Sequence, residues 1–89
     1  MSVKPGEDLV TQGIADLKDG RETVHSLLVS IGAYRLRRAG IAVPENAFSD
    51  PEHRLYELLS KEDSDSAHSR YNALIRRLVS FERAAECGL

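Results

Sequence analysis

Each of the three histidines follows an acidic residue by three positions, a spacing that could bind metal. The pairs are Glu22 and His25, Asp50 and His53, and Asp65 and His68. On a helix, residues at i and i+3 point to the same side, which is the arrangement that carboxylate-bridged di-metal bundles use. In an up-down-up-down bundle the second and fourth helices start at the same end, so the first and third pairs could approach each other.

Helix capping explains these pairs better than metal binding does. All three pairs fall at predicted helix starts, where acidic side chains oppose the positive end of the helix dipole. Di-metal sites lie mid-helix and need about four carboxylates, whereas the predicted core stripes contain no acid. We therefore predict no metal site and no cofactor. The candidate ligands of the less favoured metal site are Glu22, His25, Asp65 and His68.

Arginines form the second group that could bind a ligand. Five of them lie at the end of the second predicted helix and along the fourth: Arg35, Arg37, Arg38, Arg70 and Arg77. Residues 21–44 carry four basic and one acidic residue, net +3, whereas residues 45–65 carry two basic and seven acidic residues, net -5. This polarity could steer a phosphate-bearing ligand, but we favour a solvated helix face with complementary ends as its explanation. Arg35 is predicted on the buried side, so either the helix extends past its neighbours or Arg35 pairs with a buried carboxylate.

No residue is predicted to be catalytic. Ser64, Ser66 and Ser69 flank His68, but no strained turn or glycine-rich loop presents a nucleophile. Cys87 has no strongly electropositive neighbours in the sequence that would make its thiol reactive. A metal-dependent or ribonuclease-like enzyme centred on His25 and His68 is therefore the weakest of three functional hypotheses.

Length, composition and net charge limit the class of protein. The chain has 89 residues, 42% of them apolar, a net charge of -2 and a single cysteine. One domain spanning residues 1–89 follows from the length. The weak net charge argues against a general nucleic-acid coat, and no apolar run is long enough for a membrane span. With no apolar signal core near its N-terminus, the chain is expected to be soluble and cytoplasmic.

Helical periodicity, together with residues that start and stop helices, predicts an all-α fold, a small four-helix bundle. The predicted helices cover residues 5–19, 21–39, 50–62 and 65–87, with an irregular connector at 40–49. Gly40 and Gly88 mark helix ends, and Asp50 followed by Pro51 marks a helix start. Gly13 lies within the apolar stripe of the first helix, where it predicts a close helix crossing.

The second predicted helix is apolar on nearly every side. Its main face is flanked by a second apolar surface made of Val29, Gly32, Ala33 and Leu36. Such a helix is buried on several sides. Either it lies centrally beneath the connector, or its flank binds another protein, and we favour the second explanation because small chains often complete their core by association.

The sequence therefore favours a non-enzymatic helical interaction module. It would form a homodimer or another homo-oligomer, or dock on a partner protein, through Val29, Gly32, Ala33 and Leu36. The alternative is a nucleic-acid- or phosphate-binding module that uses the five arginines. Added salt would weaken phosphate binding steeply but would not weaken an apolar interface.

Overall fold

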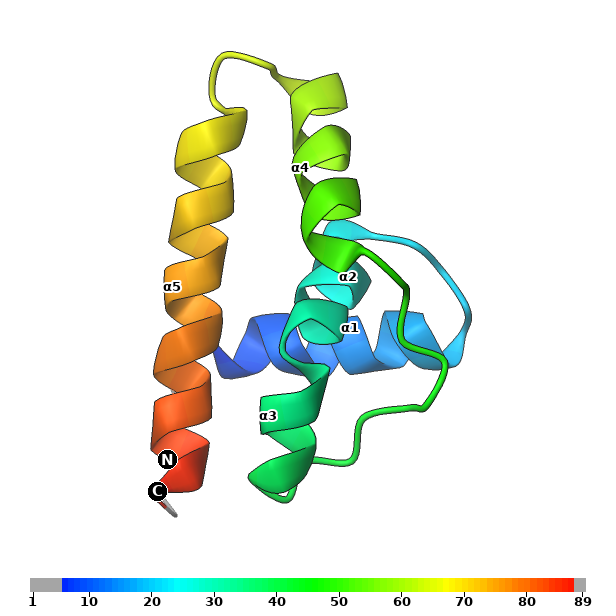
Figure 1. Cartoon of the computed structure of the whole chain (residues 1–89), viewed down its shortest axis with the longest axis vertical. Helices are drawn as coiled ribbons and strands as arrows, with labels where there is room; N and C mark the ends of the chain where they lie inside the picture. The colour runs from blue at the N-terminus through cyan, green and yellow to red at the C-terminus, as the bar shows by residue number, and fades with distance from the viewer. Residues whose placement is uncertain (1–5, 88–89) are drawn as a thin grey trace.

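Five helices build the described part of the chain, residues 6–87 of a computed structural model (Figure 1). They are α1 (Glu7–Lys18), α2 (Val24–Ile31), α3 (Ala33–Arg38), α4 (Pro51–Glu62) and α5 (Ala67–Glu86). Helix accounts for 71% of this part, and no strand occurs in it. The all-α prediction is confirmed, and the connector at 40–49 is irregular as expected. The predicted second helix, residues 21–39, is wrong as one unit, because it starts at Val24 and breaks at Gly32.

Local chemistry explains where several helices begin. Glu7 and Asp8 lie in the first turn of α1, where they oppose the helix dipole. Thr23 caps α2 through a reciprocal pair of bonds: its hydroxyl accepts from the Ser26 amide, and its own amide donates to the Ser26 hydroxyl. Pro51 occupies the first turn of α4, where its fixed φ suits the helix.

The break at Gly32 is caused by the passage of α5. A Cβ atom at this position would lie 2.6 Å from Glu82 Oε2 and 3.1 Å from the Leu78 methyl groups. Glycine therefore leaves room for α5, and its backbone (φ -93°, ψ 8°) lies outside regular helical values. Beyond the break, α3 continues along a different axis from α2 (Figure 1).

The core surrounds α2. Leu27, Leu28 and Val29 are fully buried there. On one side α1 crosses so closely that a methyl group at Gly13 would overlap the His25 carbonyl oxygen and the Val29 side chain, which confirms the predicted close crossing. The connector covers another side, where its hydrogen bonds include those from the Phe48 amide to Ser30 Oγ (3.1 Å) and from Asn46 Nδ2 to the Leu17 carbonyl (2.9 Å).

The antiparallel α4 and α5 form a hairpin that extends beyond the other helices (Figure 1). Buried residues of the 20-residue α5 are few: Ala67, Leu78, Phe81 and Glu82. Three of these four lie in its second half, which packs on α1 and α3. The first half of α5 therefore has α4 as its main neighbour. No helix of residues 6–87 is both long and apolar enough to cross a membrane.

Candidate interaction groove

A groove of about 700 Å³ runs between α4 and α5 and ends at the start of α2. Its apolar lining comes from three helices: Val24, Leu58, Ala73 and Leu74. Its polar lining comprises Glu22, Thr23, His25, Glu62, Arg70 and Arg77. A predominantly apolar concave surface with a few polar groups at its rim is typical of binding sites.

The groove is apolar because two helices cannot cover each other completely. On α4, Leu55 and Leu59 point into the core and are fully buried, whereas Leu58 is rotated away from them and is only half-buried. On α5, Leu74 is half-buried one turn before the buried Leu78. A third element would be needed to remove the remaining apolar surface of Leu58 and Leu74 from water.

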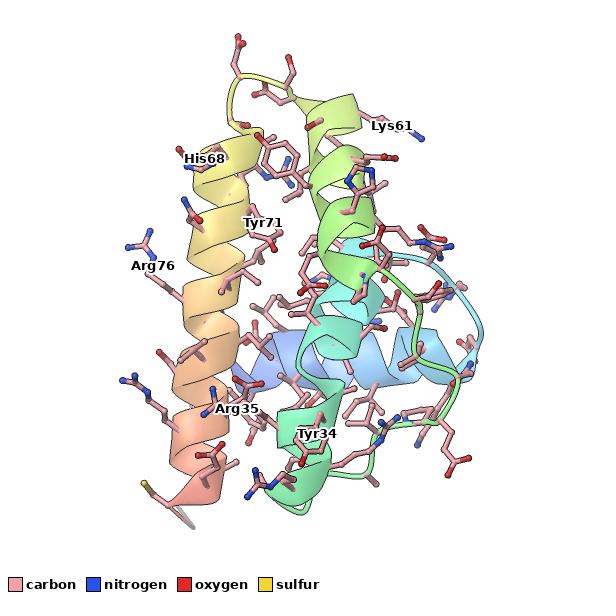
Figure 2. All side chains as sticks on the ribbon, in the orientation of Figure 1. Tyr34, Arg35, Lys61, His68, Tyr71 and Arg76 are labelled. Atoms are coloured by element: carbon pink, nitrogen blue, oxygen red, sulfur yellow. The ribbon has the colours of Figure 1, made fainter. Side chains whose placement is uncertain are left out.

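The other side of the hairpin is closed by two tyrosines. The rings of Tyr56 and Tyr71 pack edge to face with centroids 5.8 Å apart, and Tyr71 lies between the two helices in Figure 2. Burial, together with the negative charge of Glu52, raises the pKa of the Tyr71 hydroxyl. Tyr56 and Leu58 point about 160° apart around α4, because successive residues turn by about 100°. The groove is therefore the open side of the hairpin.

Charges at the rim are separated by sign. The α5 wall carries Arg70 and Arg77, whereas the wall formed by α4 and the start of α2 carries Glu62 and Glu22. Arg70 Nη2 pairs with Glu62 Oε1 at 2.9 Å, Arg77 Nη2 with Asp8 at 3.3 Å, and Glu22 with Arg54 at 3.5 Å. All these side chains are between 41% and 73% exposed. Such exposed pairs contribute about 0–1 kcal/mol each, so a ligand can replace them at little cost.

The five arginines proposed for phosphate binding do not form one site. Arg70 and Arg77 are in the groove, whereas Arg35 and Arg38 line a separate polar hollow of about 360 Å³ beside Glu86. Arg37 donates to the carbonyl oxygens of the connector residues 43 and 44, at 3.3 and 2.6 Å. The Arg38 guanidinium stacks over an exposed tyrosine ring of its own helix, 5.7 Å from the ring centroid. Most of these cations are thus already engaged within the chain.

Arg35 pairs with a buried carboxylate, one of the two alternatives that its position predicted. Its Nη1 lies 3.3 Å from Glu82 Oε1, and its Nη2 lies 2.9 Å from Glu86 Oε1. Figure 2 shows Arg35 between α3 and α5. Burial raises the pKa of Glu82, which is only 2% exposed, while Arg35 acts in the opposite direction. Glu82 thus joins α5 to α3 directly at the helix break.

A second buried carboxylate, Asp16, fixes the end of the groove. It accepts hydrogen bonds from Thr23 Oγ1 (2.7 Å), Gln12 Nε2 (2.9 Å) and Arg21 Nη2 (3.1 Å). The bond from Thr23, followed by the one from Gln12, lowers the pKa of Asp16. Because Thr23 caps α2, this network holds the segment that brings Glu22 and His25 to the groove. The expectation that the core contains no acid is therefore wrong for Asp16 and Glu82.

The acid-and-histidine pairs are not brought together. Glu22 and His25 line the groove, whereas His68 is exposed on α5, where its Nε2 lies 3.2 Å from Asn72 Nδ2. In Figure 2 His68 points away from α4, and Asp65 precedes it in the turn between the two helices. His53 pairs with Glu57 rather than with Asp50. Within residues 6–87, no group of three or more His, Cys, Asp or Glu side chains could hold a metal ion.

The flank of α2 predicted to bind a partner lies inside the chain. Val29 and Leu36 are 0% exposed, Ala33 is 6% exposed, and Gly32 is also buried. Helices α1 and α5 together with the connector cover this surface. The flank needs no second protein to cover it, because the break at Gly32 lets α2 and α3 use different neighbours. The central position beneath the connector is the explanation that the structure supports.

The groove residues Leu58, Ala73 and Leu74 were not singled out from the sequence as a binding surface. The predicted lengths did contain a hint, because the fourth predicted helix, residues 65–87, is much longer than the third, residues 50–62, against which it packs. Tyr34 on α3 is a large side chain that is 71% exposed outside the groove. Comparison of the chain with protein-family models, curated proteins and solved structures finds no match.

Proposed function

We propose that this protein is a helical interaction module that docks a partner protein in the groove between α4 and α5. The observation that carries this proposal is the open side of the hairpin, where Leu58 and Leu74 are only partly buried and line a concave, mainly apolar surface. Burial of apolar surface is the main driving force of protein association. The proposal keeps the class of function inferred from the sequence and moves the docking surface from the flank of α2 to the hairpin.

The polar groups of the groove fit a recognition role. The hydroxyl group in the groove lining belongs to Thr23. This hydroxyl has a structural role, because it donates to Asp16 and accepts from the Ser26 amide. Within residues 6–87, Arg70 and Arg77 each make one ion pair, which uses only part of the five N–H groups of a guanidinium. Apolar centres with charged rims are typical of transient protein interfaces.

The proposal is tested by a carboxylate placed inside the groove. Ala73 is exposed and lines the groove, so Ala73→Glu adds a charge to the docking surface without removing a core contact. Asn72→Glu is the matched control, because Asn72 is the preceding exposed residue of α5 and points away from the groove. A partner would be captured from a lysate of the source cells, identified, purified and titrated against each variant.

We expect Ala73→Glu to weaken partner binding by at least about tenfold, because an unpaired carboxylate in an apolar interface loses its hydration. Asn72→Glu should bind like the unmodified protein. Equal binding by all three proteins would refute the groove as the docking surface. Sedimentation of the protein alone shows whether the captured partner is a second copy of this chain.

A further inference from the structure

We infer that the occupant of the groove is an amphipathic helix of a foreign protein, with an acidic edge facing α5 and a basic edge facing α4 and the start of α2. This inference rests on the proposed function and adds the chemistry of the partner. It is carried by the opposite charges of the two walls.

The walls of the groove suit a helix. Its walls are themselves two antiparallel helices, and a third helix packs into such a groove with its apolar stripe inward. Arg70 and Arg77 are seven residues apart on α5, which corresponds to about 10.5 Å at a rise of about 1.5 Å per residue. A docked helix of the same pitch presents two acidic residues at i and i+7 to these guanidinium groups.

The wall formed by α4 and the start of α2 is acidic and therefore favours positive charge on the docked helix. Glu62 lies at one end of the groove and Glu22 at the other. Lysine or arginine residues on the second edge of the docked helix would face these carboxylates. The existing pairs with Asp8 and Arg54, and the pair between Arg70 and Glu62, are exposed and exchangeable.

The described part of a second copy, residues 6–87, offers no exposed helix with an apolar stripe of this kind. Among residues 6–87 the exposed large apolar side chains are Tyr34 on α3 and Tyr56 on α4. Two single tyrosines on different helices do not make a stripe that repeats over two turns. The exposed residues of α5 opposite its packed face, such as Arg76, Arg83 and Asn72, are polar. A foreign helix is therefore the occupant that fits both the shape and the charges.

Three synthetic helical peptides test whether the docked helix needs one acidic edge and one basic edge. All carry the same leucine stripe, with leucines spaced alternately three and four residues apart. The first has glutamates along one edge and lysines along the other, the second has glutamates on both edges, and the third has lysines on both. Each would be labelled and titrated by fluorescence anisotropy at low salt.

The mixed-edge peptide should bind about tenfold more tightly than either single-sign peptide, since each mismatched edge loses two exposed ion pairs. Arg70→Glu combined with Arg77→Glu makes both walls acidic, so this variant should bind the lysine peptide best. Arg76→Glu changes charge on a side chain that points away from α4 in Figure 2, and it should leave the order unchanged.

Equal affinities for the three peptides, or no binding of the mixed-edge peptide at millimolar concentration, would overturn the inference. The same holds if Arg76→Glu alters the order as much as the groove variants do. Loss of the captured partner through Ala73→Glu would still support the groove in those cases. The experiments therefore distinguish an error in the proposed charge pattern of the partner from an error in the proposed docking surface.

Discussion

Replacement of Gly13 by alanine tests the packing of α1 on α2. An added Cβ would overlap the His25 carbonyl oxygen and the Val29 side chain, and would lie 2.9 Å from the His25 carbonyl carbon. Two of these three atoms belong to the backbone of α2 and cannot rotate away. The two helices would have to separate by several tenths of an ångström at a crossing where Val29 is fully buried.

The expected magnitude is the difference of two opposing effects. Alanine is a better helix former than glycine by about 1 kcal/mol, which favours the variant. Overpacking of a close contact costs about 1–3 kcal/mol, and the immobile backbone neighbours favour the upper part of that range. We therefore expect Gly13→Ala to lower the free energy of unfolding by about 1–2 kcal/mol.

Thermal and urea unfolding followed by circular dichroism measure this effect. A loss of 1 kcal/mol corresponds to a Tm decrease of about 4–8 °C in a domain of this size. Ala15→Gly is the control, because Ala15 is exposed on the same helix and reports helix propensity alone. If Gly13→Ala raises the stability by the amount that Ala15→Gly removes, position 13 is not a close crossing and the packing of α1 is refuted.

Three further predictions concern the buried groups. Val29→Glu should unfold the protein, seen as loss of the helical circular-dichroism signal, because Val29 is 0% exposed; a folded variant would show that the α2 flank is a surface. Burial raises the pKa of Glu82, so the folded state binds the Glu82 proton more strongly than the unfolded state does. The free energy of unfolding therefore falls as pH rises through the interval above the ordinary glutamate pKa. Glu82→Gln should remove that fall, and a pH-independent difference in Tm between the two proteins would contradict it. The pKa of Asp16 is lowered, so its contribution to the free energy of unfolding is complete above the ordinary aspartate pKa and is lost as pH falls through the lowered value. Asp16→Asn should therefore make the stability less sensitive to acid. Unchanged acid unfolding of this variant would refute the role of the Asp16 hydrogen bonds.

The sequence was sufficient for the helical class and for most helix ends. Pro51 and the acidic first turns mark helix starts that depend on nearest neighbours along the chain. The role of Gly13 also followed from its position in an apolar stripe. These features are local, so periodicity and capping chemistry reveal them.

The break at Gly32 could not be predicted, because it depends on α5, about fifty residues away. The same separation hides the pair between Arg35 and Glu82, although the unusual position of Arg35 suggested a buried acid. Asp16 is buried because its partners Thr23 and Arg21 follow a turn whose course the sequence does not specify. Once Gly32 divides the second helix, the fold can enclose its apolar flank, and the open surface is found on the hairpin instead.

The position of a docked partner tests the central claim most directly. Amide chemical-shift changes on adding the captured partner to isotopically labelled protein would map its footprint. The groove account predicts the largest changes at Leu58, Ala73 and Leu74, with small changes at Tyr34 and at exposed residues on the outer side of α5 such as Arg76. Changes centred on Tyr34 and α3, with the groove signals unmoved, would contradict it.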